Sequence, residues 1–382
     1  RIGLLMKNNQ RDKNRNNYFI VFALVCIGLC PLFVFGQKSK YSNEFLTLGV
    51  GAKGLALANT QVAMSEDVTS AYWNPAGLAN AKQRYQLSLM HAEYFAGIAK
   101  YDYASLSYRV DENQVVGASI IRFGVDNIPN TTQLIDKQGN VNYDLITYFT
   151  AADWGVLLSY GRTFEQVKGL AFGANLKIIH REIGDFAGAW GFGLDAGLQY
   201  RINKWKFGIV AKDLTSTFNA WYFNLSDEME EVFKLTDNEI PTDGLEYTLP
   251  RLLVGAGRDF SLGKGFSLMT TIDCDMSFDG RRNELVSSKA MNISPHAGIE
   301  FGYKNIVFLR GGVGNFQKEK KITSFEEGYK TITTCQINFG VGICIKDIVT
   351  IDYAYCDIGD VSIALYSHIF SLKLALNRFK KT

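Results

Sequence analysis

The residues of this sequence that most resemble a chemical motif are residues 49–54, GVGAKG, near the amino terminus. They match the G-x-G-x-x-G fingerprint of dinucleotide-binding sites. That fingerprint lies between a strand and a helix of a βαβ unit, with an acidic residue about 20 positions further on, whereas segments of strand periodicity follow here. The small residues at 49–58 therefore predict a short helix that packs closely against a wall, rather than a nucleotide site.

Side chains that could catalyse a reaction are few and scattered. A hydrolase needs a nucleophile, a base and an orienting group held together. Four cysteines follow position 36 without the spacing of a metal site, and we interpret them as small hydrophobic residues. The sequence thus predicts neither an enzyme nor a cofactor. None of the four histidines lies in a recognisable catalytic arrangement: His91, His180, His296 and His368.

The amino-terminal segment has the pattern of a secretory signal peptide, because basic residues precede an apolar stretch at 19–35 that ends before Gly36. A single membrane anchor is the alternative, although the stretch is short for a helical span. No second stretch of this length exists, which excludes a polytopic helical membrane protein. Without residues 1–36 the formal net charge changes from +2 to −2, so the charge does not favour a nucleic acid partner.

Alternation of apolar with polar or glycine residues dominates the chain from Tyr85 onward. Soluble strands are usually about 5 to 6 residues long, whereas strands that cross an outer membrane need about 9 to 11. The alternating segments here are of the longer kind. We count about 14 of them, near 85–96, 100–110, 114–125, 150–163, 168–182, 188–201, 204–217, 249–260, 265–278, 295–303, 306–316, 331–345, 348–357 and 367–378.

The connections between these segments alternate between short turns and longer loops, near 126–149, 219–248, 279–294, 317–330 and 358–366. Short turns at one end and long loops at the other are typical of outer-membrane barrels. The sequence therefore predicts an all-β fold, a transmembrane antiparallel up-and-down β-barrel of about 14 strands in the bacterial outer membrane, exported through the Sec pathway. The expected organisation is a signal peptide (1–36), a helical hatch in the lumen (37–83) and the barrel (84–382).

The predicted inner face carries charges of both signs in equal number. A channel that selects one sign should show a bias, so we expect a cross-linked or plugged lumen. If Tyr303 opposes Val307 across a two-residue turn, Glu300 lies opposite Arg310, and we predict that they form an ion pair. Parity also places Cys335 outward and Cys356 inward, which argues against a disulfide between them. Inward glycines are compatible with close packing or with a pore. The inward charged residues are Lys177, Asp195, Lys206, Lys212, Asp273, Asp275, Glu300, Arg310, Asp352 and Lys373.

Two ends of the chain resemble a known family. Residues 44–53 (EFLTLGVGAK), the pairs at 62–63 and 67–68, and residues 70–79 (SAYWNPAGLA) resemble the opening of the PorV/PorQ family, a branch of the FadL-like outer-membrane barrels of Bacteroidota. The YWNPAGL stretch is the most specific part. Residues 367–374 (SHIFSLKL) resemble the family's last strand, and between these ends the similarity is one of architecture.

The resemblance implies a 14-stranded barrel with its amino-terminal segment folded into the lumen as a hatch. In PorV the barrel is a non-enzymatic partner of the type IX secretion machinery. It sits beside the large SprA-type translocon and receives exported cargo with C-terminal sorting domains, while PorQ belongs to the cell-surface attachment step. FadL itself passes long-chain fatty acids and other hydrophobic molecules. We therefore expect docking to a translocon or cargo, surrounded by outer-membrane lipid, with a FadL-like uptake channel as the alternative.

The hatch motif comprises Tyr72, Trp73, Asn74, Pro75, Ala76 and Gly77. Proline disfavours helix at the preceding Asn74, the Asn74 side chain can bond its own backbone in a turn, and Gly77 allows a positive φ. These residues predict a compact turn that leads the hatch into the first strand.

The connection at 219–248 holds eight acids and one base, a local charge of −7. Ser226 is expected to cap a short helix with apolar residues on one face. One interpretation is an aromatic belt at the membrane boundary followed by a solvated acidic loop. The other is a docking surface, with Trp221, Tyr222, Phe223, Met229 and Phe233 as its partner-binding residues.

Overall fold

The computed structural model describes residues 37–38, 42–134, 140–324, 328–357 and 366–378. The chain divides into two compact units, 1–37 and 38–382, and the second contains the barrel. The predicted signal peptide at 1–36 lies outside the described residues.

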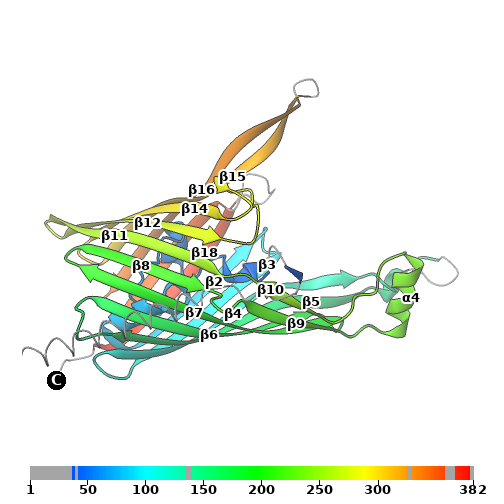
Figure 1. Cartoon of the computed structure of the whole chain (residues 1–382), viewed down its shortest axis with the longest axis horizontal. Coiled ribbons are helices and arrows are strands. Elements are labelled where there is room, and N and C mark those ends of the chain that lie inside the picture. Colours follow the sequence, from blue (N-terminus) through cyan, green and yellow to red (C-terminus); the bar gives the residue numbers. More distant parts are fainter. Residues whose placement is uncertain (1–36, 39–41, 135–139, 325–327, 358–365, 379–382) are drawn as a thin grey trace, which may run out of the picture. The chain divides into compact units, whose positions relative to one another are not determined.

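The second unit is a closed antiparallel barrel with 14 strand positions (Figure 1). The seam closes where Leu374 of β18 pairs with Leu87 of β2. β8 and β9 share one position because both pair with β7, and β10 and β11 share the next because they pair with β9 and β8. The strands are β2 (Gln83–Tyr94), β3 (Ala99–Arg109), β4 (Gln114–Asn130), β5 (Thr147–Thr163), β6 (Leu170–Ile183), β7 (Ala187–Ile202), β8 (Trp205–Lys212), β9 (Thr217–Phe223), β10 (Gly244–Thr248), β11 (Arg251–Gly263), β12 (Phe266–Ser277), β14 (Asn292–Tyr303), β15 (Val307–Ser324), β16 (Gly328–Ile345), β17 (Val349–Asp357) and β18 (Tyr366–Arg378).

The remaining elements are short. Of the four helical elements in residues 42–82, two lie before the hatch motif and two overlap its ends. The elements are strands β1 (Gln37–Lys38) and β13 (Val286–Ser287), α-helices α2 (Ala52–Ala56), α3 (Ser70–Trp73) and α4 (Asp227–Leu235), and 3-10 helices η1 (Glu44–Leu46), η2 (Pro75–Asn80) and η3 (Tyr143–Leu145).

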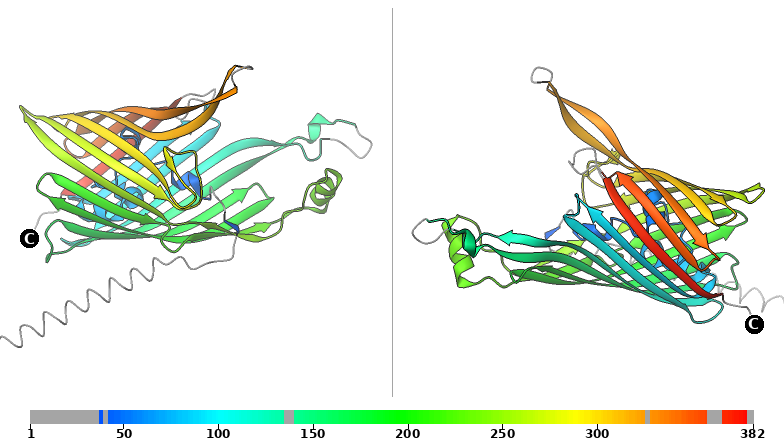
Figure 2. Two further views of the ribbon diagram at one scale, coloured as in Figure 1. Left: turned by 45° about the horizontal axis from the view of Figure 1, so that its top comes forward. Right: turned by 180° about the vertical axis from the view of Figure 1, so that it is seen from behind.

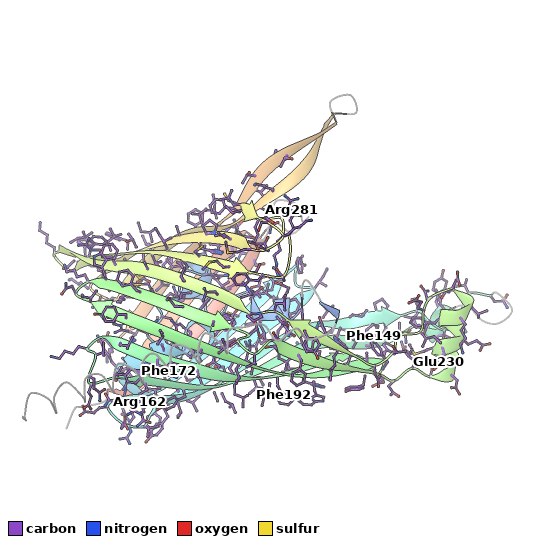
Figure 3. All side chains as sticks on the ribbon, viewed as in Figure 1. Phe149, Arg162, Phe172, Phe192, Glu230 and Arg281 are labelled. Atoms are coloured by element: carbon purple, nitrogen blue, oxygen red, sulfur yellow. The ribbon has the colours of Figure 1, made fainter. Side chains whose placement is uncertain are left out.

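The outer face of the barrel is apolar, as the alternation predicts. On β7, Trp190, Phe192, Leu194 and Leu198 are exposed, while the residues that alternate with them are buried: Gly191, Gly193, Asp195 and Gly197. Figure 3 shows such side chains, Phe192 among them, on the outside of the wall. An apolar face of this extent belongs in a bilayer. Among the described residues, no helix has the length and apolar character needed to cross a membrane.

Three predicted loops contain more strand than the sequence indicates. Residues 317–330 were predicted as a loop, but β15 and β16 extend through most of them, and residues 126–130 continue β4. Residues 217–223 and 244–248 form the paired strands β9 and β10. The apolar face ends where these strands leave the membrane, so the alternation disappears although the backbone ladder continues. Most of the predicted loop at 358–366 lies outside the described residues.

One predicted strand is interrupted. The segment 204–217 is not continuous, because β8 ends at Lys212 and β9 begins at Thr217. Asp213 and Ser216, between them, adopt positive φ angles of 55° and 58°. On the neighbouring position, Leu249 and Pro250 separate β10 from β11. The wall of the barrel is therefore irregular at this one height.

Residues 42–82 fill the inside of the barrel, and we call this segment the hatch. Strands from around the barrel donate or accept hydrogen bonds with its backbone: Asn175 of β6 donates to Ala71 O (2.8 Å), and Asn338 of β16 donates to Leu55 O (2.7 Å). Most of the apolar hatch side chains are buried. The hatch leads directly into β2 at the short-turn end, and the long hairpins extend from the opposite end (Figure 2).

Candidate functional site

The inner wall is shaped to the hatch by glycines. A methyl group on Gly173 would lie 2.1 Å from the carbonyl carbon of Pro75, and one on Gly312 would lie 2.4 Å from the backbone nitrogen of Ala58. Real side chains do not approach backbone so closely, so the hatch backbone rests directly on the wall. Of the two roles compatible with inward glycines, close packing describes these positions. A Cβ on Gly208 would lie 2.3 Å from Val62 O, and one on Gly298 would lie 2.9 Å from Leu57 O. At Gly197 and Gly340 a Cβ would instead meet the side chains of Asn74 and Ala56.

The hatch motif ties the two halves of the hatch together. Tyr72 Oη donates to Leu46 O (2.7 Å) and accepts from Gly49 N (2.9 Å), and Trp73 Nε1 donates to Val50 O (3.1 Å). All six motif residues are buried. These bonds connect the residues just before α2 with Tyr72 and Trp73 of α3. The motif therefore determines how the hatch folds on itself.

The turn after the tryptophan is built as the sequence predicts, with one exception. Asn74 Oδ1 accepts from Ala76 N (3.2 Å), while Asn74 Nδ2 donates to Val62 O (2.8 Å) and to Leu198 O of the wall (3.1 Å). The expectation of a positive φ at Gly77 is wrong, because Gly77 is not among the residues with positive φ. A Cβ there would lie 2.3 Å from Ser65 O, so it is the lack of a side chain that this position requires.

Charged hatch residues pair with the wall at four places. Glu44 binds Arg282 (2.9 Å), Lys53 faces Glu300 (3.6 Å), Glu66 binds Arg201 and Lys206, and Asp67 binds Lys373 (2.5 Å). Burial by itself raises the pKa of Asp67, but the charge of Lys373 and its hydrogen bond outweigh burial and hold this pKa well below its usual range. The lumen is cross-linked, as the balanced charges predict.

Asp67→Asn is expected to flatten the acid side of the stability profile. The pKa of Asp67 is lower in the folded chain than its usual 3.8, so the carboxylate stabilises the fold above that pH, and this stabilisation is lost as pH falls through the folded-state value. We expect the variant to lose about 2 kcal/mol at neutral pH and to approach the wild type in strong acid. Denaturant unfolding at several pH values measures this, and a difference that does not change with pH would contradict it.

The predicted ion pair between Glu300 and Arg310 is present, with Arg310 Nε 2.6 Å from Glu300 Oε2. The same guanidinium donates through Nη1 to Asp352 Oδ1 (2.6 Å), and Lys53 of the hatch lies 3.6 Å from Glu300. Arg310 of β15 therefore links β14 and, across the intervening β16, β17, and it reaches the hatch through Glu300. The sequence register found the pair, but the third and fourth members needed the closed barrel.

A cavity of about 420 Å³ lies between the hatch and the wall. Its apolar lining includes Leu55, Trp73 and Tyr94, but charged groups surround them. Three of its lining residues, Asn59, Asp273 and Asn338, each have a buried side-chain oxygen with no hydrogen-bond partner among the described residues. The cavity is thus mixed in polarity rather than a hydrophobic pocket. Its charged lining residues are Glu44, Lys212, Arg251, Asp273, Asp275, Arg282 and Glu284.

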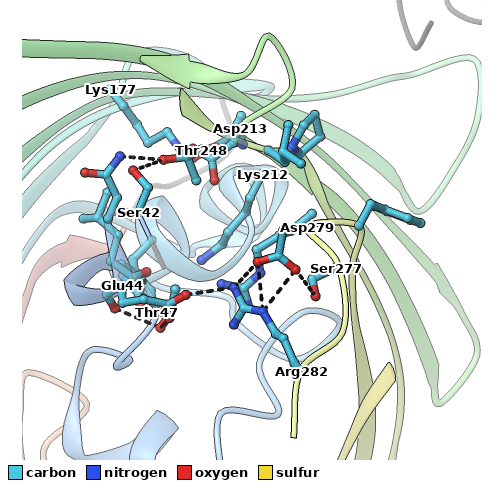
Figure 4. Close-up of a pocket in the computed structure, with 18 of the residues that line it drawn as sticks. Ser42, Glu44, Thr47, Lys177, Lys212, Asp213, Thr248, Ser277, Asp279 and Arg282 are labelled. Carbon is cyan, nitrogen blue, oxygen red and sulfur yellow. Dashed lines mark hydrogen bonds and ion pairs between the residues drawn. The ribbon is translucent and has the colours of Figure 1, made fainter. Parts of the chain in front are cut away.

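A smaller cavity of about 40 Å³ adjoins the interruption in the wall (Figure 4). Lys212, at the end of β8, lines both cavities and lies 4.3 Å from the centre of the Tyr72 ring. Among the described residues no carboxylate is within ion-pair distance of Lys212, whereas Arg251 and Arg282 bind Asp275 and Asp279. Parity predicts that Lys212 faces inward, but the alternation continues through residues 204–217 and does not reveal the break beside it.

The predicted partner-binding residues separate into different environments. Trp221 is held inside the molecule: its Nε1 donates to Glu246 (2.7 Å) and Arg181 lies 5.0 Å from its ring. Phe223 stacks on Trp221, while Tyr222 faces outward. The three aromatics alternate along strand β9, so Tyr222 points to the opposite face from Trp221 and Phe223, and their part in binding a partner stays a prediction.

The helical part of this connection forms as predicted. Ser226 accepts from Met229 N (3.4 Å) at the start of α4. Met229 and Phe233 are partly buried, and Glu230 lies at the far end of the hairpin (Figure 3). The large exposed apolar side chains at this end were not predicted, since isolated loop residues show no periodicity: Tyr143 (73%), Tyr148 (68%) and Leu235 (79%).

The described cysteines are free, with Cys335 exposed and Cys356 buried, as parity predicts. Among the described residues, no three histidine, cysteine or acidic side chains group as metal ligands. The histidines serve local contacts; His91 Nδ1, for example, lies 2.6 Å from Asp102 Oδ1.

No protein-family model matches this sequence, and no curated protein is significantly similar to it. Solved structures are similar in fold. A Pseudomonas aeruginosa FadL homologue has a TM-score of 0.49 at 11% identity, covering 86% of this chain and 98% of that chain. The CymD monoaromatic hydrocarbon channel has 0.52 at 14% identity, with 86% and 98% covered, and the P. putida toluene transporter TodX has 0.52 at 12% identity, with 87% and 99% covered. The chain is an outer-membrane β-barrel whose fold is similar to that of CymD and TodX.

At these identities the likeness concerns the fold. The barrel has short helices near the amino terminus, inside the wall, and 14 strand positions. Short turns then mark the periplasmic end and long hairpins the extracellular end. The mixed-polarity cavity described above opens between the hatch and the wall of this barrel.

Proposed function

We propose that this chain is a non-enzymatic outer-membrane barrel that acts by docking, through its extracellular hairpins, to a large SprA-type translocon of type IX secretion or to cargo with C-terminal sorting domains. The observation that carries the proposal is the filled lumen. The hatch backbone rests on wall glycines and its charges pair with the wall, so a ligand path through the barrel would require many contacts to break at once.

The extracellular end supplies the docking surface. The hairpin of residues 217–248, which we call the α4 hairpin, extends beyond the barrel in both views of Figure 2. It carries eight acids against one base and exposes Tyr222 and Leu235. Exposed apolar side chains surrounded by charged residues are typical of a surface that binds another protein. The excess of acids favours a partner with a basic surface.

A channel for hydrophobic compounds is the second candidate, and the structural comparisons favour it over the first. CymD and TodX are named as a monoaromatic hydrocarbon channel and a toluene transporter. The interruption at residues 213–216 lies beside a cavity, where a ligand could leave sideways. Against this candidate, seven charged residues line the larger cavity, and a hydrophobic ligand would leave them without water.

The test is affinity purification of the full chain from native outer membranes. The α4 hairpin is shortened by replacing residues 225–242 with a glycine-serine turn, which keeps β9 paired with β10 because Trp221 already opposes Gly244. The matched control shortens the other long hairpin, β15–β16, beyond the pair Gly314 and Gln336. We expect the secretion partner to be lost with the first variant and retained with the second.

Two results would count against docking. One is an unchanged set of partners after the α4 hairpin is shortened. The other is recovery of the barrel alone, carrying a bound hydrophobic compound. This second outcome, together with loss of uptake after Lys212→Met beside the wall interruption, would support the channel instead.

A further inference from the structure

The periplasmic turns of one half of the barrel each carry a lysine. Four consecutive short turns, β7–β8, β11–β12, β14–β15 and β16–β17, contain Lys204, Lys264, Lys304 and Lys346. All four are exposed, and none forms an ion pair with another described residue. We call these four residues the basic arc.

Two turns in the other half of the same end have the opposite charge. The turns β3–β4 and β5–β6 hold Asp111, Glu112 and Glu165 against a single base, Lys168. In the basic arc the only acid is Asp347. Exposed cations also lie beside the start of β2, at Lys82 and Arg84, so the contrast is one between turns.

Three of the arc lysines occupy backbone positions that lysine disfavours. The φ angles are 50° at Lys264, 51° at Lys304 and 54° at Lys346. Two-residue hairpin turns of this left-handed kind prefer asparagine, aspartate or glycine, because other side chains crowd the backbone there. The same unfavourable residue type at the same place in three turns indicates that a cation is needed at this level.

Aromatic side chains place the arc at the membrane boundary. Trp205, Phe266 and Tyr303 face outward on the strands directly above the turns, and each is at least 37% exposed. Aromatic girdles mark the interface of outer-membrane barrels, and long basic side chains there extend toward the headgroups. Arg258 adds a fifth cation, with its guanidinium 4.9 Å from the Trp205 ring.

We propose that the basic arc binds anionic phospholipid headgroups of the periplasmic leaflet, giving this half of the barrel an annulus of anionic lipid. The chemistry is that of ammonium groups against phosphodiesters at a membrane surface, where each lysine strengthens attraction to anionic lipid. The inference is independent of whether the extracellular end docks a partner or the lumen passes a ligand.

The test compares two triple variants of the full chain, each losing three positive charges. The arc variant is Lys264→Asn, Lys304→Asn and Lys346→Asn. The control variant is Lys82→Asn, Lys168→Asn and Lys289→Asn, which lie outside the arc. Lipid retained after extraction from vesicles of mixed phosphatidylglycerol and phosphatidylethanolamine is measured by native mass spectrometry.

We expect the wild type and the control to retain phosphatidylglycerol preferentially, and the arc variant to lose this preference by about tenfold or more. The melting temperature of the arc variant should rise, since asparagine suits a left-handed turn better than lysine. Equal preference in all three proteins, or equal loss in both variants, would overturn the proposal. So would a wild-type preference that does not weaken with added salt, because headgroup attraction is screened.

Discussion

Gly312→Ala should destabilise the barrel by about 3 kcal/mol or more, the upper range for forcing atoms into a packed interior. The added methyl would lie 2.4 Å from the backbone of both Leu57 and Ala58. No rotamer change can relieve a contact between a Cβ and backbone, so either the hatch moves away from β15 or the strand bends. Unfolding in denaturant measures the loss, and limited proteolysis shows whether the hatch has become accessible.

The neighbouring residue supplies the control. Gly311 lies on the same strand but faces lipid, and the nearest atom to a methyl group there is 3.8 Å away. Gly311→Ala is expected to be neutral or to stabilise by about 0.5–1 kcal/mol, because glycine is unfavourable within a strand. If both variants lose stability equally, the requirement at 312 belongs to the strand and not to the seating of the hatch.

The barrel itself could be predicted because each membrane-spanning strand has a recognisable sequence pattern. Each of the 14 predicted segments corresponds to an observed strand position, since one face of every strand contacts lipid and alternation follows. The prediction failed where that constraint ends. The sequence beyond Gln317 no longer alternates between apolar and polar residues, although β15 and β16 stay paired as far as Ser324 and Gly328.

The interior could be predicted only in its charge balance. Parity identified the inward residues, including Glu300 and Arg310, but an inner-face glycine looks the same whether it lines a pore or supports a hatch. That distinction depends on contacts between residues far apart in the chain, such as Gly173 with Pro75. The alternation likewise concealed the β8–β9 break beside Lys212, although it placed this lysine inward, because parity describes faces and not continuity.

The partner-binding prediction shows the same limit. An aromatic cluster in sequence suggests a shared surface, but in a strand neighbouring side chains point to opposite faces. Trp221 is consequently engaged by Arg181 and Glu246, while Tyr222 remains exposed. Tyr143 and Leu235, which are more exposed, have no sequence neighbours that would identify them.

Arg310→Leu should cost about 3–5 kcal/mol, the range for removing one partner of a buried ion pair. The Arg310 side chain is 2% exposed, and its removal would leave the carboxylates of Glu300 and Asp352 without it. Lys53 is 3.6 Å from Glu300 and can compensate only in part. As a control, Lys100→Leu breaks an exposed pair with Asp126 (3.4 Å) and should cost about 1 kcal/mol or less.

The decisive variant also neutralises the carboxylates of Glu300 and Asp352, which lose Arg310 in Arg310→Leu. If the loss comes from unpaired buried charge, adding Glu300→Gln and Asp352→Asn to Arg310→Leu should recover most of the stability, because a neutral set is far less costly to bury. If the triple variant is no more stable than Arg310→Leu, the guanidinium acts instead by packing between β14, β15 and β17. Denaturant unfolding of the wild type, Arg310→Leu, the triple variant and the Lys100→Leu control separates the two cases. Only in the first case are balanced lumen charges required to keep the hatch inside the barrel.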